Sequence, residues 1–438
     1  MDTIGERIKE RRKTLGLTQV DLSGPELSHA MISLIERNRT KPSLKTLEYI
    51  ASKLGVTLSY LMEETNVDDK KNHENFNEID IGKIVGICKS LMALKKFEEV
   101  KNKITVYLNY EMSPSNKGIL LKMLGQIYMN DLEYQKAIEE FNAALIYLSP
   151  LDSNEYIEVH YDLAICNKML KRYDKCITNS LYSLSLLKAN FYTENTVLQL
   201  KILYNLSYCY CELQEYEKGL STINQAIQIM NDSSLYYHEG NFYLLKGTAE
   251  LYLQDYQQAI SSTKHALKHL NSPNNIEALL NLGVLYRETK EYDLAQQYIQ
   301  KSLQVSINYS NKENELKCYF ELAITYYKSL DYDKVEEMYK RIINDCDQFK
   351  DIKFKFSFLM ACTKYAQGLH DESLMYLNEL ELDINKCNIK LLLPKIYFLK
   401  SKIYENQGDI QNAIRFLKES IQTIDGINNK LYNIWNLI

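Results

Sequence analysis

Apolar residues in the second part of the chain recur with the spacing of amphipathic helices, and a twelve-residue frame repeats. An aromatic or apolar residue opens the frame, a small residue follows three positions later, a larger apolar one at seven and a second small one at ten. The clearest copy has Tyr134, Ala137, Phe141 and Ala144 at these positions. Further copies begin, at steps of 36 to 43 residues, at Phe97, Tyr173, Tyr216, Tyr256, Tyr292, Tyr332, His370 and Ile410. Such a period predicts an α-solenoid of stacked helix pairs.

The stretch before each frame predicts the first helix of a pair. It often holds a small residue followed three positions later by tyrosine, as in Gly125/Tyr128 and Gly283/Tyr286. Small residues let two helices approach closely, and large ones fill the space between pairs. We predict an all-α body over residues 81–438 with about nine helix pairs. Those starting near Ile84, Phe354 and Pro394 are degenerate, as terminal pairs often are.

Residues 1–62 show a different pattern, which predicts five short helices. The first predicted helix contains Ile4, Ile8 and Leu15 and ends at Gly16. The second runs from Gln19 to about Ser23 with Thr18 as its cap, and the third from His29 to Arg37 with Ser28 as its cap. The fourth starts at Pro42-Ser43 and stops at Gly55, and the fifth runs from Thr57 to Met62. The inward residues expected in the fourth helix are Leu44, Leu47, Ile50, Ala51 and Leu54. Gly24-Pro25 interrupts the chain after the second predicted helix.

Charge separates this head from the body. The chain has 438 residues and a formal net charge of −5, but residues 1–62 carry ten Lys/Arg against seven Asp/Glu. A mildly basic head on an acidic body indicates that only the head meets a polyanion. Residues 63–80 are almost wholly polar and predict a linker. This linker either lets the head change its orientation relative to the body or is a passive tether.

Other sequence signals narrow the classes of function. Nine cysteines are spread singly, mostly inside apolar stretches, and we expect them to be reduced and buried. No apolar signal region or membrane span is evident, so a cytoplasmic protein is expected. HExxH, P-loop, GxGxxG and GxSxG motifs are absent, and we predict no enzyme and no cofactor. His265 and His269 stand four residues apart, but no Cys or carboxylate partner is evident, so no metal site is predicted.

The head resembles the Cro/lambda-repressor type of helix-turn-helix domain. Three stretches support the resemblance: Leu17-Thr-Gln-Val-Asp-Leu-Ser23, Ile32-Ser-Leu-Ile-Glu-Arg-Asn38 and Lys41-Pro-Ser-Leu-Lys-Thr-Leu47. In this domain the second helix of the motif lies in the major groove. The resemblance implies base-facing residues at Ser28, His29, Ala30, Ser33 and Leu34, and phosphate contacts at Gln19, Arg37, Arg39 and Lys41. Arg37 has an alternative role in an ion pair with Glu36 or Glu10.

The body resembles tetratricopeptide repeats, whose stacked pairs form a right-handed superhelix with the first helices lining a concave groove. The resemblance implies a peptide-binding face comprising Tyr161, Asp162, Lys168, Tyr204, Asn205, Tyr208, Leu245, Thr248, Asn281, Arg287, Phe320, Glu321 and Tyr327. Asn205 and Asn281 hold the same place in their repeats, and an amide both donates to and accepts from a peptide backbone. Arg287 is a candidate clamp for a carboxylate. Alternatively, these are ordinary solvated residues.

The combined architecture resembles the peptide-pheromone-sensing regulators of Gram-positive bacteria, a family that includes Rgg, Rap, NprR, PlcR and PrgX. The resemblance implies a cytoplasmic homodimer that binds double-stranded DNA, at a palindromic operator, under the control of a short oligopeptide. The alternative is an interaction protein whose body grips another protein, such as a response regulator, while the head only localises it. The final segment with Trp435 is expected to cap the solenoid, with a dimer contact or a strip folded over the groove as alternatives.

Overall fold

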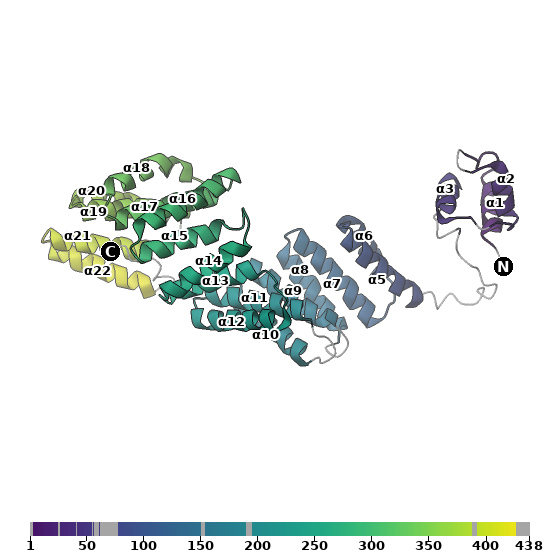
Figure 1. Ribbon diagram of the computed structural model, residues 1–438, viewed down its shortest axis with the longest axis horizontal. Helices are drawn as coiled ribbons and strands as arrows, with labels where there is room; N and C mark the ends of the chain where they lie inside the picture. The colour runs from purple at the N-terminus through teal and green to yellow at the C-terminus, as the bar shows by residue number, and fades with distance from the viewer. Residues whose placement is uncertain are drawn as a thin grey trace. The chain divides into compact units, whose positions relative to one another are not determined.

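The computed structural model describes residues 3–24, 27–40, 42–54, 56, 61, 78–149, 154–189, 195–387 and 392–425 (Figure 1). The chain forms two compact units, 1–116 and 117–438. The regular secondary structure in the described ranges is helical. Gly24 and Leu27 form an isolated β-bridge. The predicted fold class, a helical head followed by an α-solenoid, is confirmed.

The first unit begins with three helices, α1 (Ile4–Thr14), α2 (His29–Glu36) and α3 (Leu44–Leu54). Side chains cap their first turns: Thr3 forms a capping box with Glu6, and Ser28 accepts from the backbone N–H of Met31 at 3.3 Å. Most of the predicted inward residues lie in the shared core, whose fully or almost fully buried members are Ile8, Leu22, Leu27, Ile32, Ile35, Leu47, Ile50, Ala51, Leu54 and Leu61. A Cβ at Gly5 would lie 2.2 Å from the carbonyl oxygen of Ile35, so only glycine allows α1 and α2 to approach this closely.

The predicted helix from Gln19 to Ser23 is not formed. Thr18 does accept from the backbone N–H of Asp21 at 3.3 Å, and the Asp21 carboxylate accepts in return from the Thr18 backbone N–H at 2.6 Å. The chain then makes turns over residues 19–22, and Gly24 and Leu27 exchange two backbone hydrogen bonds that direct it away from a helix. Leu15 is also corrected: it follows the last turn of α1 and is 43% exposed. The fifth predicted helix lies mostly outside the described residues.

The first helix pair of the body, α5 (Glu78–Ala93) and α6 (Phe97–Tyr107), belongs to the first unit. Residues 62–77 lie outside the described ranges, so the predicted boundaries at 62 and 81 stay predictions.

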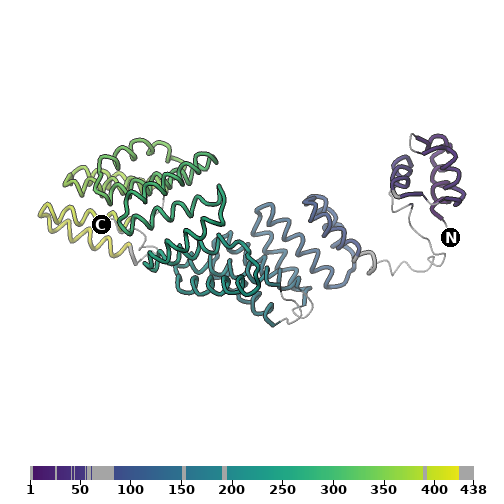
Figure 2. Tube along the Cα trace, in the orientation of Figure 1, coloured from purple at the N-terminus to yellow at the C-terminus, as the bar shows by residue number. Residues whose placement is uncertain are grey.

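The second unit contains eight further helix pairs in its described ranges, and neighbouring helices run alongside one another (Figures 1 and 2). The helices are α7 (Pro114–Asn130), α8 (Tyr134–Tyr147), α9 (Asn154–Met169), α10 (Tyr173–Ala189), α11 (Thr196–Glu212), α12 (Tyr216–Ser233), α13 (Glu239–Tyr252), α14 (Tyr256–His269), α15 (Ile276–Glu288), α16 (Tyr292–Asn308), α17 (Lys312–Lys328), α18 (Tyr332–Ile342), α19 (Lys350–Ala366), α20 (His370–Cys387), α21 (Leu393–Asn406) and α22 (Ile410–Asp425). Every one of the nine frame residues is the first residue of a second helix.

The small and large positions of the frame are buried as predicted. Ala137, Phe141 and Ala144 have no exposed surface. A Cβ on Gly125 of the preceding helix would lie 2.6 Å from the Phe141 ring, and one on Gly283 would lie 2.3 Å from Ile299. Glycine in the first helix thus accommodates the large residue of the second, which sets the close contact within a pair.

The same type of turn joins the two helices of every pair. The residue two positions before each second helix has a positive φ, between 56° and 79°. Only two of the nine are glycines; the others include Leu132 (φ 62°) and Leu330 (φ 65°). The next residue donates its N–H to a carbonyl five residues back, as Glu133 does to Tyr128 at 2.9 Å. This is the hydrogen bond of a Schellman motif.

Packing extends from pair to pair. First helices also contact one another, α9 with α11, α11 with α13, α13 with α15 and α15 with α17.

All nine cysteines are free and eight are buried, in line with the prediction; Cys387 is half-buried. Among the described helices, none combines the length and apolar character needed to cross a membrane.

Candidate functional site

The outer face of α2 presents the predicted base-facing residues. Ser28, His29, Ala30 and Leu34 are exposed, and Ser33 is half-buried. Ile32 and Ile35 on the opposite face are anchored in the core, with 0% and 2% of their surface exposed. The helix therefore holds polar, small and apolar side chains outward on a buried base, an arrangement compatible with docking in a major groove.

A buried ion pair fixes the far end of α2. Glu36 accepts from Arg12 through Nε at 2.6 Å and through Nη2 at 2.8 Å, and from the Gln19 amide at 2.6 Å. Burial opposes ionisation of Glu36, but the hydrogen bonds from Arg12 and Gln19 together lower its pKa. The pair joins α1 to α2, and it engages Glu36, one of the two carboxylates named as alternative partners of Arg37.

The predicted phosphate contacts differ in their surroundings. Arg37 and Arg39 are exposed just after α2. The Gln19 side chain is half-buried against Glu36, and because residues 19–22 form turns, no helix start supports its backbone N–H as a phosphate donor. Lys41 lies outside the described residues.

Four of the predicted peptide-binding residues converge between α9 and α11. The Lys168 ammonium donates to Asn205 Oδ1 at 2.6 Å, and it lies 5.5 Å from the ring centre of Tyr208 and 5.9 Å from that of Tyr204. Burial lowers the pKa of Lys168 below its usual range. Asn205 is 3% exposed, and its Nδ2 is buried without a hydrogen-bond partner among the described residues. An unused amide donor lies next to a lysine and two tyrosines, so a ligand acceptor that reached it would gain a hydrogen bond.

Other predicted residues already have partners within the solenoid. Asn281 donates to Thr248 at 3.1 Å. Arg287 is 7% exposed and binds Glu321 at 2.5 Å and Glu288 at 3.1 Å, so a peptide carboxylate would have to displace both. Asp162 accepts from Gln126 at 2.9 Å, and burial raises its pKa to about 6.

The remaining members of the predicted face pack mainly against the solenoid interior. Phe320 is 4% exposed and contacts the Phe356 ring edge-on, with the ring centres 5.0 Å apart. Tyr161 and Leu245 are partly buried against one hydrophobic cluster. Tyr327 is half-buried beside another cluster, and burial raises its pKa.

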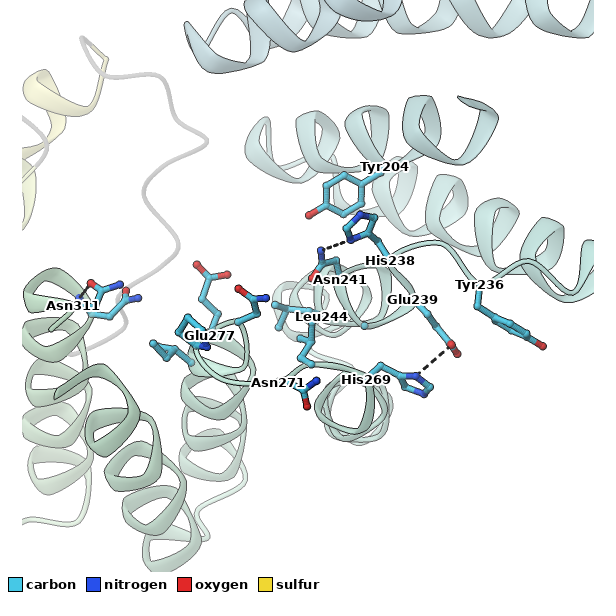
Figure 3. A pocket seen from close by; sticks show the side chains of 16 residues that line it. Tyr204, Tyr236, His238, Glu239, Asn241, Leu244, His269, Asn271, Glu277 and Asn311 are labelled. Atoms are coloured by element: carbon cyan, nitrogen blue, oxygen red, sulfur yellow. Dashed lines mark hydrogen bonds and ion pairs between the residues drawn. The ribbon is translucent and has the colours of Figure 1, made fainter. Parts of the chain in front are cut away.

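A pocket of about 740 Å³ lies where α11, α13 and α15 meet the ends of α14 and α17 (Figure 3). Its volume is in the range of ligand sites. Tyr204 lines it and belongs to the predicted face. The pocket is rich in amides, which both donate and accept: Asn241, Asn271, Asn274, Asn311 and Asn314. Sequence reasoning missed these residues because it searched the middles of the first helices, whereas the asparagines lie at helix ends and in turns.

A second pocket of about 510 Å³ includes Phe320 and Glu321 from the predicted face. It lies along α17 and the first turns of α19, with Lys317 and Lys355 among its lining residues.

Three segments match known family models. Residues 8–61 match the helix-turn-helix model, and residues 275–347 and 394–423 match tetratricopeptide-repeat models. The matches assign the head to the helix-turn-helix type and two segments of the body to the tetratricopeptide-repeat type. The predicted resemblance of both parts is thereby confirmed.

Relatives of this helix-turn-helix protein include two regulators. It is 42% identical over 78 residues to the immunity repressor protein of Bacillus phage phi105, covering 17% of this chain and 54% of the repressor. It is 42% identical over 59 residues to the HTH-type transcriptional regulator DdrOP3 of Deinococcus deserti, covering 13% and 46%. The chain thus spans about half the length of each curated relative.

Solved structures share the tetratricopeptide fold. The apo form of the quorum sensor NprR from B. thuringiensis superposes with a TM-score of 0.64 at 15% identity, covering 79% of this chain and 99% of NprR. A Rap protein solved in complex with Competence and Sporulation Factor superposes with a TM-score of 0.53 at 14% identity, covering 80% and 99%. The repeat region of the chain therefore has the fold found in these two structures.

Proposed function

We propose that this protein is a transcription regulator that binds double-stranded DNA through α2 and that a short signalling oligopeptide, bound by the repeats, controls this binding. The exposed face of α2 carries the proposal. Its outward side chains lie on a helix that is capped at Ser28, anchored by Ile32 and tied to α1 through Glu36. Both curated relatives are named as a repressor or a transcriptional regulator, which supports the DNA-binding half.

The peptide half rests on the cluster formed by Lys168, Tyr204, Asn205 and Tyr208. The Asn205 amide donates to no acceptor in the part of the chain that the structure describes, and the adjacent rings offer apolar surface. A peptide carbonyl that accepts from Nδ2 would be favoured in one arrangement of α9 and α11. Differential binding of this kind shifts the population of the solenoid conformations. The fold is shared with NprR, which is named as a quorum sensor, and with a Rap protein solved in complex with Competence and Sporulation Factor, and this likeness agrees with the proposed role.

The protein would act in the cytoplasm as a homodimer on a palindromic operator. The head carries only ten Lys/Arg against seven Asp/Glu, so one head supplies little electrostatic affinity. Two heads on successive half-sites would combine their contacts. The function needs no catalytic group, and we assign it no enzymatic activity.

The first test identifies the two ligands. Mass spectrometry of material that co-purifies with the full-length protein should find an oligopeptide. Footprinting of the region upstream of its own gene should reveal a protected palindrome. Protection that is absent over upstream DNA and over a random-sequence library would refute the DNA-binding half. In that case, capture of a response regulator would favour the interaction-protein alternative.

The second test removes the amide donor of Asn205 and adds one negative charge, which the matched control adds as well. Asn205→Asp keeps an oxygen for the Lys168 ammonium but removes the N–H donor. We expect DNA binding without peptide to be unchanged, and peptide affinity to fall roughly tenfold, the effect of about 1.4 kcal/mol. Asn281→Asp is the matched control, because the Asn281 amide is already bonded to Thr248. Equal peptide affinity in Asn205→Asp and the wild type would exclude this cluster as the contact.

A further inference from the structure

Three potential metal ligands converge at one end of the α13–α14 pair. Glu239 is the first residue of α13, and His265 and His269 lie one turn apart near the end of α14. His265 Nε2 is 2.8 Å from Glu239 Oε1, and His269 Nδ1 is 3.5 Å from Glu239 Oε2. The ligand atoms of all three side chains lie within 4.8 Å of one another. The carboxylate that the sequence did not reveal stands 26 residues before His265.

The distances suit a small divalent ion. Bonds of about 2.0–2.2 Å to nitrogen and oxygen place neighbouring ligand atoms roughly 3.3 Å apart around a tetrahedral metal. The two contacts of Glu239, at 2.8 Å and 3.5 Å, bracket that separation. The two imidazole rings lie 24° from parallel with their centres 4.9 Å apart, so both stand on the same side of α14. Because the ligand atoms lie within 4.8 Å of one another, metal binding would require the side chains to draw closer together.

The surroundings hold the ligands in place while leaving access. The Glu239 side chain is 15% exposed, and those of His265 and His269 are 35% and 41% exposed. The Tyr243 ring packs on His265 with the ring centres 3.8 Å apart, which restricts the imidazole. Glu239 and His269 also line the 740 Å³ pocket, where Figure 3 shows them joined beside Tyr236.

We infer that Glu239, His265 and His269 form a binding site for a divalent transition-metal ion of the Zn²⁺ class. Two imidazoles and one carboxylate suit Zn²⁺, Ni²⁺ or Cu²⁺ better than Mg²⁺ or Ca²⁺, which prefer oxygen ligands. Three protein ligands leave a position open for water or for a carboxylate or imidazole of a bound molecule. The ion would join the start of α13 to the end of α14 and thereby stiffen one wall of the pocket.

The test uses the full-length protein without a histidine tag, stripped with a chelator. Titration calorimetry with Zn²⁺ should give one site per chain, and Zn²⁺ should raise the melting temperature because it binds only the folded state. Co²⁺ should give the absorption of a nitrogen- and oxygen-ligated ion. His269→Gln and Glu239→Gln should each weaken Zn²⁺ binding at least about tenfold, since even outer-shell partners contribute 10- to 100-fold.

Two controls separate this site from other ligands. His238→Gln alters a histidine of the same pocket outside the cluster and should leave Zn²⁺ affinity unchanged. Cys387→Ser removes the half-buried thiol and should also have no effect. Absence of Zn²⁺ binding in the wild type would overturn the inference, as would binding that survives His269→Gln and Glu239→Gln in folded proteins or disappears with Cys387→Ser.

Discussion

At the residue scale, some charged and polar side chains are exposed to solvent, whereas others are buried and already bound to a partner in the chain. His29 and Arg39 are exposed, whereas Arg12 and Glu36 bind each other in the interior. Within the described ranges of the solenoid, the Asn205 amide has no acceptor, whereas the Asn281 amide, at the same place in its repeat, donates to Thr248. Equivalent positions thus differ in what they can offer a ligand, and substitutions can test the difference.

The exposed residues of the head predict two distinct effects on DNA binding. His29→Ala should change which operator sequence is preferred, because His29 would face base edges. Arg39→Ala should weaken binding to all sequences alike and lower the salt slope by about one, because a phosphate contact carries no sequence information. Binding to an operator library at several salt concentrations measures both effects. A uniform loss in both variants would contradict the assignment of His29.

Asp162 predicts a pH dependence of stability. Burial raises its pKa from 3.8 to about 6, so the folded state holds the proton more tightly than the unfolded state. Stability therefore falls as pH rises from about 4 to about 6, and the full penalty, on the order of 3 kcal/mol, remains at pH 7. Asp162→Asn should flatten this dependence and raise the free energy of unfolding at pH 7.

Urea unfolding between pH 4 and pH 7 measures the effect of Asp162→Asn. Asp232→Asn, which alters an exposed residue of α12, is the control and should leave the pH profile as in the wild type. A parallel profile in both variants would mean that Asp162 is ionised without penalty.

At the element scale, the repeat frame located the second helices because each frame position has one packing role. The residue that opens the frame begins the helix, and the positions three, seven and ten residues later face its partner. Sequence periodicity reports burial directly, so it predicts these elements well. It could not predict the pairs Arg12–Glu36 and Glu239–His265, whose members stand 24 and 26 residues apart and meet only through tertiary packing. The short helix at Gln19 failed because two backbone hydrogen bonds between Gly24 and Leu27 compete with it.

The left-handed turn residues predict that a Leu→Gly substitution changes the free energy of unfolding in opposite directions in a turn and in a helix. Leu330 has φ 65° and is 71% exposed, so Leu330→Gly should raise the free energy of unfolding by up to about 1 kcal/mol through relief of strain. Leu181, 47% exposed within α10, is the matched control, and Leu181→Gly should lower it by about 1 kcal/mol. Chemical denaturation of both variants measures the changes. Destabilisation of equal size in both would show that the Leu330 backbone is unstrained.

At the scale of the whole molecule, the proposed regulation would require the solenoid to influence the spacing of two heads in a dimer. First helices contact one another from repeat to repeat, and Lys168–Asn205, Asn281–Thr248 and Arg287–Glu321 each link neighbouring first helices. A ligand that alters one such link changes the packing of adjacent pairs. A solenoid can pass this change along because each pair contacts chiefly its neighbours.

A dimer on a palindrome predicts a dependence on half-site spacing. Insertion of five base pairs between the half-sites should place them on opposite faces of the duplex and abolish cooperative binding, whereas ten base pairs should restore part of it, because one DNA turn is about 10–10.5 base pairs. Gel-shift titration of the operator and its two spaced variants measures this. Equal affinity for all three would show that the heads bind independently.

The uniform turn has a consequence for how such a chain changes length. Gln254 and Lys290 both have a positive φ, and each stands two residues before a second helix. Deletion of residues 256–291 would bring Asp255 directly before Tyr292, so that α13 would meet α16 through the same kind of turn. The chain would lose one repeat, and the joint between residues 255 and 292 would keep the same kind of turn. Internal duplication is the reverse operation, so unequal recombination between repeats is a ready route by which the solenoid gains or loses a helix pair.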